Sequence, residues 1–349
     1  MASINLLQQP HVELLEAITM LVTVHLLSGN VQAGAIGNTL AAQYVLRIGG
    51  NTRDCFIKAS TFAATGDERF RINYHLRNLF WICYQQDKEL CLRSGQPPTL
   101  SEDNCDLDLP VGYEQNWNNS LAIDNSTAPV FPGDLRLSQI KSKAYFELYS
   151  RRALEKNGAL VLSAIRQLDD DLEEWRMSIP ADYRPTMLFN EKTPHRPRHF
   201  NIRSLMLRLE YYHCVAYIHQ ACARFQTMTG SPDQEIQGVT SSLTFSMAAC
   251  RSSLYYLVAV QDTLVPKDFW LTLFYTLSAI LTVFCFLISN PGTPEARNDL
   301  EIIRKIAAQL RRLGKDDLFT EEHSQTERVW KVITALEGLA KRTIEKQIS

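Results

Sequence analysis

Apolar residues recur along most of the chain at intervals of three and four, the spacing that places them on one face of an α-helix. This pattern predicts helices over 10–28, 31–48, 50–64, 69–92, 138–156, 159–177, 200–228, 234–262, 266–289, 294–313 and 322–346. Alternation of apolar and polar residues, which would indicate strands, is missing from the sequence. The sequence therefore predicts an all-α fold of many helices.

Two segments between predicted helices, 94–136 and 180–199, are rich in Gly, Pro, Asn and Asp and are predicted to be long irregular loops. The helices on both sides of each loop carry apolar faces that need partners, so neither loop has the character of a linker between independent domains. A chain of 349 residues, 45% of them hydrophobic, can bury a large core. We expect a single helical domain over 1–349.

The most distinctive pattern of the chain runs from Arg77 to Pro110. Its first part is helical, and the apolar stripe of this helix contains Asp87. A lone carboxylate on a buried stripe costs free energy unless it is paired or hydrogen-bonded, so we expect a donor to reach Asp87. Gly95 and the two prolines that follow cannot continue the helix, and the chain is predicted to leave it in an extended conformation.

These residues resemble the middle homology domain, the regulatory domain of fungal zinc binuclear-cluster transcription factors. The signature of that family runs through an arginine, a Phe-Trp pair, a tyrosine, an aspartate, a Gly-Arg-Pro turn and an acidic segment that ends in Leu-Pro. The corresponding residues here are Arg77, Phe80, Trp81, Tyr84, Asp87, Gly95, Gln96, Pro97, Pro98, Asp106, Asp108, Leu109 and Pro110. Gln96 departs from the family, which usually has an arginine there, and this removes a charged donor from the turn.

The resemblance covers about residues 12–291 and leaves the two predicted C-terminal helices, within 294–346, outside it. The segment 37–51 resembles an Ala-rich helix of the family, and 140–180 resembles its paired helices. The helix at 201–225 resembles a Tyr-rich segment of the family, which often ends in Arg-Pro, whereas this chain continues without a proline.

The resemblance implies a transcription regulator: the regulatory or effector domain of a fungal zinc-cluster-type factor that controls transcription by RNA polymerase II, for example of a metabolic gene cluster. It implies a location in the nucleus, with the cytoplasm as an alternative, and no catalytic activity. The implied partners are DNA, only through a zinc-cluster module, the transcription machinery or a co-regulator, and a small-molecule effector. A homodimer is compatible with the family, and no membrane partner is expected.

The zinc-cluster module itself is expected to be missing, because no closely spaced cysteine pairs occur in this sequence. The eight cysteines are Cys55, Cys83, Cys91, Cys105, Cys214, Cys222, Cys250 and Cys285, with no C-x-x-C pair among them. We expect buried reduced thiols, no metal ligands and no cofactor, since zinc would belong to the module. One alternative is a regulator whose module lies upstream, and the other is a stand-alone co-regulator that acts through protein contacts without binding DNA.

The charge of the chain gives no reason to expect direct binding to nucleic acid. The formal net charge is −2, whereas DNA-binding domains usually have a strongly basic face. The one basic cluster is interpreted as a solvated loop that leads into a helix, with a weak phosphate contact as the alternative. Its residues are His195, Arg196, Arg198, His199 and Arg203.

The segment 270–289 contains no charged residue and is long enough to cross a membrane. It also contains several Thr and Ser residues and has no clear basic flank, which favours a central buried helix over a membrane span. A membrane-associated helical protein remains the third alternative.

Motifs that would indicate an enzyme are absent: the sequence has no G-x-S-x-G, no H-E-x-x-H, no P-loop and no dinucleotide fingerprint. His213 and His219 are interpreted as helix residues with polar tips. The acidic run 169–174 is interpreted as a solvated helix face, because consecutive helical residues point in different directions. We therefore predict no catalytic residues.

Overall fold

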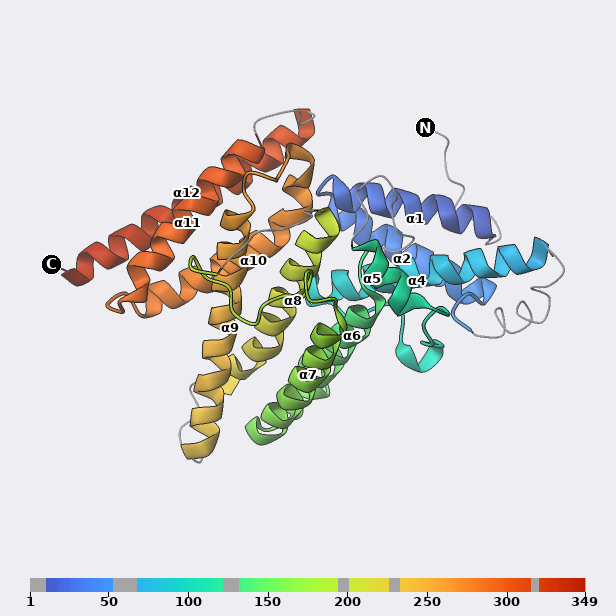
Figure 1. Ribbon diagram of the computed structural model, residues 1–349, viewed down its shortest axis with the longest axis horizontal. Coiled ribbons are helices and arrows are strands. Elements are labelled where there is room, and N and C mark those ends of the chain that lie inside the picture. The colour runs from blue at the N-terminus through green and yellow to red at the C-terminus, as the bar shows by residue number, and fades with distance from the viewer. Residues whose placement is uncertain are drawn as a thin grey trace. The chain divides into compact units, whose positions relative to one another are not determined.

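The computed structural model describes residues 11–52, 68–121, 132–193, 201–225, 233–314 and 320–348. Every regular element in these ranges is helical, which confirms the all-α prediction (Figure 1). The α-helices are α1 (Val12–Leu27), α2 (Val31–Ile48), α4 (Glu68–Ser94), α5 (Tyr113–Ser120), α6 (Leu135–Leu148), α7 (Gly158–Ser178), α8 (Ile202–Gln220), α9 (Asp233–Ala259), α10 (Phe269–Ser289), α11 (Glu295–Leu313) and α12 (Thr320–Ile348). Short 3-10 helices are η1 (Glu102–Asn104), η2 (Ala153–Glu155), η3 (Ala221–Phe225) and η4 (Pro266–Asp268).

One helix, α5, lies inside the segment predicted as a loop over 94–136, so this part of the loop prediction is wrong. The sequence of α5 is rich in Asn, which has a low helix propensity. Tyr113 and Trp117, one turn apart, are both buried, so packing stabilises this helix where propensity does not. The second predicted loop is irregular over its described part, 180–193. The predicted helix at 50–64 lies outside the described residues except for 50–52, which form a turn.

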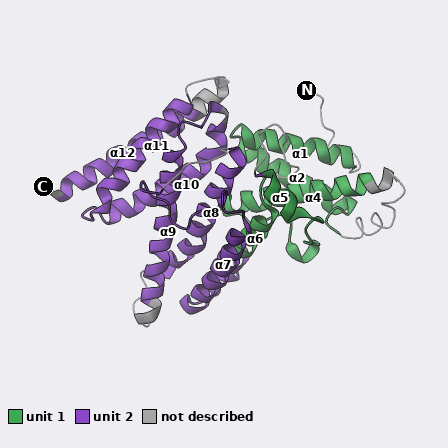
Figure 2. Ribbon diagram, in the orientation of Figure 1, with its two compact units in different colours: residues 1–120, 127–145 green, residues 121–126, 146–349 purple. Residues whose placement is uncertain are grey.

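The chain divides into two compact units (Figure 2). Unit 1 comprises residues 1–120 and 127–145, and unit 2 comprises 121–126 and 146–349. The division at 145/146 falls within α6, whereas the short stretch 121–126 that is assigned to unit 2 lies inside the predicted loop 94–136. The expectation of a single domain over 1–349 stays a prediction.

In unit 1, α1 and α2 form a helical hairpin that packs against α4. The two helices approach closely because α2 places Gly34 and Gly37 against α1. A Cβ atom at Gly37 would lie 2.7 Å from Cγ2 of Val22, closer than packed atoms can come. Asn30 begins α2 by accepting a hydrogen bond from the backbone N–H of Ala33.

In unit 2, α10 is the central helix and contacts α8, α9, α11 and α12. Its long apolar sequence would also allow it to cross a membrane, and half of its most apolar stretch is buried within the protein. Thr272 and Thr276 on its buried side donate their hydroxyl hydrogens to backbone carbonyls one turn earlier. These two buried hydroxyls are therefore paired within the helix and the turn before it.

Candidate functional site: a polar clasp on helix α4

The signature residues of α4 form an aromatic cluster in the core of unit 1. Phe80, Trp81 and Tyr84 are completely buried. The ring centroids of Phe80 and Trp81 lie 5.1 Å apart and those of Trp81 and Tyr84 5.4 Å apart, both with edge-to-face geometry. The cluster fixes the side of α4 along which the chain returns after the helix ends.

The return begins at Gly95, whose backbone has a φ of 69°. This left-handed conformation favours glycine, and the backbone N–H of Gly95 donates to the carbonyl of Cys91 at 2.8 Å, which closes the end of α4. Pro97 and Pro98 follow without a helical turn, as the sequence predicted. Gln96, at the position of the family's arginine, is exposed.

Asp87 holds the returning segment by its backbone. Its Oδ1 accepts the N–H of Thr99 at 2.8 Å, and its Oδ2 accepts the N–H of Leu100 at 3.1 Å. The Nζ of Lys88, which has no solvent exposure, lies 3.0 Å from the same Oδ2 and donates to the carbonyl of Leu100. The prediction that a donor reaches Asp87 is confirmed, because three donors do.

Arg77 holds the segment at its other end. Its guanidinium donates to the carbonyl of Gly50 at 3.3 Å and to the carbonyl of Asp106. The planar group also lies 4.4 Å from the ring centroid of Phe80 and 5.1 Å from that of Trp81. One arginine thus joins the aromatic cluster to the acidic segment.

Three further side chains bind the segment, two in its middle and one at Leu107. The Tyr84 hydroxyl donates to Oε1 of Glu102 at 2.6 Å, and burial together with the charge of Glu102 raises the pKa of Tyr84. Asn51 donates to the carbonyl of Asn104 at 2.6 Å. Gln139 of α6 donates to the carbonyl of Leu107 at 2.9 Å. We call these contacts between residues 99–107 and the side chains of Asn51, Arg77, Tyr84, Asp87, Lys88 and Gln139 the clasp.

The clasp brings some of the predicted signature residues together and leaves others at its margin. Asp106 takes part through its backbone carbonyl, and both Asp106 and Asp108 have exposed side chains. The carbonyl of Pro110 accepts the backbone N–H of Tyr113 at 2.9 Å and so leads into α5. The sequence analysis did not identify Lys88, Asn51 and Gln139. Single polar residues in a helix or loop form no motif that would indicate a contact with a distant backbone.

A second ion-pair group joins α4 to α6 beside the clasp. Glu89 accepts from Nε of Arg93 at 2.8 Å and from the ammonium group of Lys141, and the side chain of Lys141 is almost completely buried. Buried charges of this kind are tolerated only when they are paired, so the ion pair between Glu89 and Lys141 couples the two helices.

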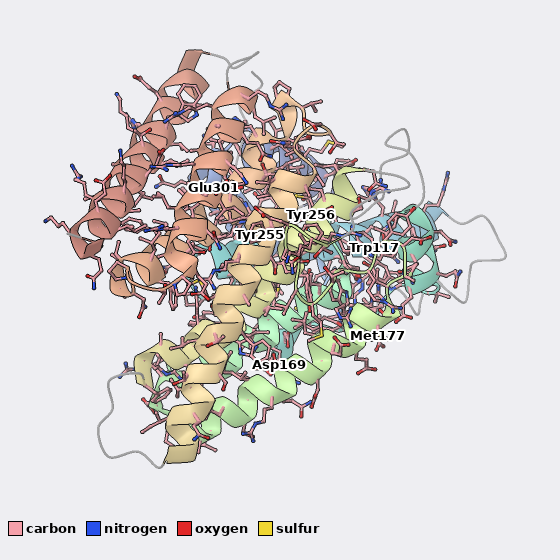
Figure 3. The ribbon with its side chains drawn as sticks, turned by 60° about the vertical axis from the view of Figure 1, so that its left-hand side comes forward. Trp117, Asp169, Met177, Tyr255, Tyr256 and Glu301 are labelled. Carbon is pink, nitrogen blue, oxygen red and sulfur yellow. The ribbon has the colours of Figure 1, made fainter. Side chains whose placement is uncertain are left out.

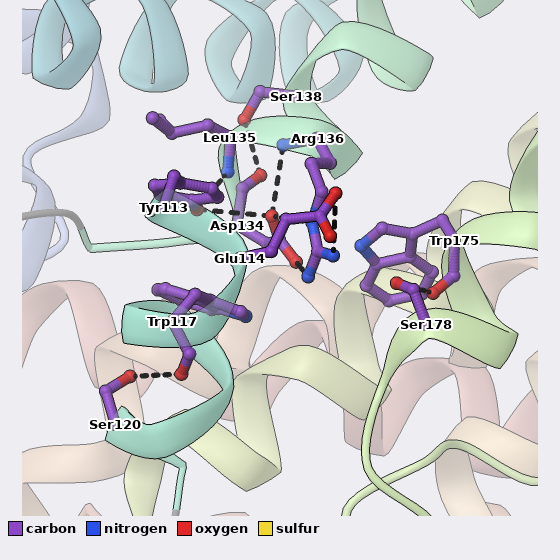
Figure 4. A network of polar contacts seen from close by, with 10 residues as sticks. All are labelled: Tyr113, Glu114, Trp117, Ser120, Asp134, Leu135, Arg136, Ser138, Trp175 and Ser178. Atoms are coloured by element: carbon purple, nitrogen blue, oxygen red, sulfur yellow. Dashed lines mark hydrogen bonds and ion pairs between the residues drawn. The ribbon is translucent and has the colours of Figure 1, made fainter. Parts of the chain in front are cut away.

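Asp134 organises the approach to α6 (Figure 4). It lies between Tyr113, whose hydroxyl is 3.2 Å from Oδ1, and Arg136, whose Nη2 is 2.7 Å from Oδ2. The Tyr113 hydroxyl also accepts the N–H of Leu135 at 2.8 Å. Burial and the charge of Asp134 raise the pKa of Tyr113, so the phenol stays protonated and keeps donating.

In unit 2, three side chains from α7, α8 and α9 form a hydrogen-bonded row (Figure 3 labels Asp169). Oδ1 of Asp169 lies 3.2 Å from Nε2 of His219, and Nδ1 of His219 lies 2.7 Å from Oγ of Ser242. Asp169 thus contacts His219, which the interpretation of 169–174 as a solvated helix face did not include. The order of groups is that of a hydrolase triad; Ser242 is 5% exposed, and the row joins three helices.

The cysteines follow the prediction of buried thiols with one clear exception. Cys83, Cys91, Cys214, Cys222 and Cys250 are buried, Cys105 is half-buried and Cys285 is exposed. Burial raises the pKa of Cys83, Cys91 and Cys250 to about 12 in each case. The prediction is wrong for Cys285, which lies on the outer side of α10, and Cys55 is outside the described residues.

The predicted basic cluster can be judged only at Arg203, since its other members fall outside the described residues. Arg203 is half-buried in α8, and burial lowers its pKa. In the described part of the chain, no group of three His, Cys, Asp or Glu side chains has an arrangement that could hold a metal ion.

Comparison with known proteins gives the chain a family context. It is 29% identical over 285 residues to an ABC-transporter-regulating transcription factor of Aspergillus fumigatus, a match that covers 77% of this chain and 30% of that protein. It is 30% identical over 256 residues to an ABC-transporter-regulating transcription factor of Aspergillus oryzae, covering 69% of this chain and 28% of the relative. It is 24% identical over 229 residues to the fusaridione A cluster transcription factor of Fusarium heterosporum, covering 64% and 41%.

No family model matches the chain, and no solved structure matches it. The chain spans about 30% of the length of the two Aspergillus relatives. The similarity nevertheless extends over most of this chain, 77% of it for the first of these relatives. The chain is thus a relative of fungal transcription factors.

Proposed function

We propose that this chain regulates transcription by RNA polymerase II as the regulatory or effector region of a fungal zinc-cluster-type factor. The observation that carries the proposal is the similarity to named fungal transcription factors over 77% of the chain. The place of action is the nucleus, where a regulator of this class meets its target genes.

The clasp supports a regulatory role in which unit 1 works as one rigid element. Its polar contacts join α4, α6 and the acidic segment, and they include charges that are stable only while every partner is in place. A small-molecule effector or a protein partner that shifts the segment 99–107 would therefore change α4 as well. Trp81, Tyr84 and Asp87 would transmit such a rearrangement.

The target genes are proposed from the names of the relatives. Two relatives are named for regulating ABC transporters and one for a fusaridione A cluster. We propose genes for transport or for a metabolic gene cluster as targets of this chain as well. We propose no catalytic activity and no cofactor for this chain.

DNA recognition is proposed to depend on a zinc-cluster module with paired cysteines, which would also hold the zinc. Mapping the 5′ end of the transcript tests this part. An in-frame exon with paired cysteines supports a DNA-binding regulator. A transcript that starts at Met1 without such an exon contradicts it and favours the co-regulator that acts through protein contacts.

A reporter assay tests the effector role directly. The full chain is fused to an unrelated DNA-binding domain and directed to a reporter promoter. We expect reporter expression to differ from that of the DNA-binding domain alone, in either direction, by about threefold or more, which corresponds to under 1 kcal/mol of coupling. Equal expression with and without the chain, at equal protein levels, contradicts the effector role.

A further inference from the structure

Helix α12 packs against α10 and α11 through one side, on which Ile333, Ala340 and Ile344 are buried. The opposite side carries exposed residues at alternating intervals of four and three, the heptad spacing along which a second helix packs. We call these residues the α12 face. They are Arg328, Val332, Ala335, Leu339, Arg342 and Lys346.

The α12 face is apolar in its middle and positive at both ends. Val332 is 51% and Leu339 46% exposed. Arg328 precedes this apolar part, and Arg342 and Lys346 follow it. In the part of the chain that the structure describes, none of these three cations has an ion-pair partner. The face therefore presents uncompensated positive charge around an apolar centre.

The carboxylates of α12 do not neutralise these cations. Wherever the side chain of a glutamate in this helix is described, it already lies beside another basic group. The pairs are Glu327 with Lys331 at 3.2 Å, Glu337 with Arg304 of α11 at 3.1 Å and Glu345 with Lys341 at 3.8 Å. The positive charge of the α12 face is thus available to a partner.

This charge decides against a second copy of the chain as the occupant. Two parallel copies would place Arg328 against Arg328, and two antiparallel copies would place it against Arg342 or Lys346. Like charges that meet across an interface are strongly unfavourable. The complementary surface therefore has an apolar centre with carboxylates on both sides of it.

An anionic membrane or a nucleic acid would match the charge but not the apolar centre. A helix that lies on a membrane inserts a broad apolar side, and in α12 that side, with Ile333 and Ile344, is already buried in the protein. Phosphate groups pair with cations and would give Val332 and Leu339 no apolar contact. A helix with apolar and acidic side chains satisfies both parts of the face.

Gly338 adds room for such a helix. It lies beside the α12 face, one residue before Leu339, and a Cβ atom built on it would meet nothing within 4 Å. Glycine in the middle of a helix lowers its stability relative to alanine, so the position is not explained by helix propensity. The missing side chain allows the backbone of a partner to come close.

We propose that the α12 face is a docking surface for an acidic amphipathic helix of a partner protein. Apolar side chains of that helix would pack on Val332 and Leu339 at heptad spacing, and its carboxylates would pair with the cations at both ends. The face belongs to unit 2, and the inference goes beyond the proposed role in transcription and does not depend on it.

The test measures binding of two defined probes to the full chain by fluorescence anisotropy. The first probe is a labelled synthetic helix of about six turns, with leucine at heptad positions and glutamate at the flanking positions. The second probe has lysine in place of every glutamate. The comparison separates recognition of the acidic groups from general binding of an amphipathic helix.

Matched variants place the binding site on α12. Arg328→Glu/Arg342→Glu reverses the charge of the α12 face. Arg166→Glu/Arg297→Glu, at exposed positions of α7 and α11, changes the net charge by the same amount and is the control. Circular dichroism shows whether each variant is folded, and substitutions at such exposed positions should leave the fold unchanged.

We expect the unaltered chain and the control variant to bind the acidic probe with equal affinity. Arg328→Glu/Arg342→Glu should bind it at least about tenfold more weakly, and so should Val332→Ser/Leu339→Ser. The lysine probe should bind the unaltered chain at least about tenfold more weakly than the acidic probe.

The proposal is overturned if the unaltered chain does not bind the acidic probe, binds both probes equally, or loses no affinity in either α12 variant. Normal binding by Val332→Ser/Leu339→Ser alone also overturns it, because charge would then act without helix packing. Two further results contradict the assigned occupant. One is a dimer in sedimentation that Arg328→Glu/Arg342→Glu dissolves. The other is tighter binding, lost in the same variant, to duplex DNA or to vesicles of phosphatidylcholine and phosphatidylserine than to the acidic probe.

Discussion

The side chain of Lys88 has no solvent exposure, and its Nζ contacts Oδ2 of Asp87 and the carbonyl of Leu100. An isolated buried charge would cost several kcal/mol, so neither member of this pair is stable in the core without the other. The sequence predicted that Asp87 needs a donor. It did not reveal that the donors come from its neighbour in the chain and from a backbone twelve residues away.

Asp87→Asn should destabilise the protein by about 3–5 kcal/mol. The amide leaves Lys88 without a counter-charge, and it has one oxygen where the carboxylate has two to accept the N–H groups of Thr99 and Leu100. The free energy of unfolding in urea measures the effect. Asp103→Asn, an exposed aspartate in η1, is the control and should change stability by less than about 0.5 kcal/mol. Equal stability of the two variants would show that the clasp does not depend on its buried charge.

Arg77→Lys keeps the charge but loses the planar group that spans two carbonyls and the ring of Phe80. We expect a loss of about 1–3 kcal/mol in unfolding free energy. The exposed Arg71→Lys on the same helix should be neutral. If both substitutions have the same effect, the contacts of Arg77 do not stabilise the fold.

Thiol reactivity should follow burial. At pH 8, a thiol with a pKa of about 12 is ionised in about one molecule in ten thousand, so Cys83 and Cys250 should resist iodoacetamide in the native protein. Cys285 is exposed and should be labelled within minutes. Peptide mapping by mass spectrometry reads each site, and rapid native labelling of Cys83 would contradict the buried core.

At the scale of elements, apolar periodicity was enough to locate the long helices of the described chain, whereas α5 was missed. The long helices owe their positions to apolar faces that repeat over several turns, and such repeats are visible in a sequence. Helix α5 has only Tyr113 and Trp117 on its buried side, too few for a period, and it forms because unit 1 provides a place for these two rings. The side-chain donors of the clasp were also invisible, since each comes from a different element.

The turn after α4 depends on the backbone of one residue. Gly95→Ala places a Cβ atom in a left-handed conformation and should cost about 1 kcal/mol, although no neighbouring atom lies within 4 Å of the added group. Gly338→Ala, in the middle of α12 and equally free of neighbours, should instead stabilise by about 0.5–1 kcal/mol. Urea unfolding of the two variants separates backbone conformation from packing. A loss of stability in both variants would contradict the view that the left-handed backbone of Gly95 is what disfavours alanine there.

At the scale of the whole molecule, the fold class was predictable from the sequence and the division into two units was not. The main division, at 145/146, falls within the continuous helix α6, where the sequence gives no sign of a boundary. Which helix faces meet depends on the three-dimensional arrangement of many apolar surfaces, and a periodic pattern shows only that each helix has such a face. The role of the chain rests on its resemblance to a family and on its relatives, because a helical fold supports many functions.

The measurement that tests this role most directly is the transcript profile of source cells that lack the gene, compared with cells in which the unaltered chain or its variants are restored. We expect a limited set of genes, grouped in transport or in a metabolic cluster, to change severalfold on deletion and to return with the unaltered chain and with Asp103→Asn. Asp87→Asn should fail to restore them. An unchanged transcript profile after deletion, under conditions in which the protein is present in unaltered cells, would contradict the account.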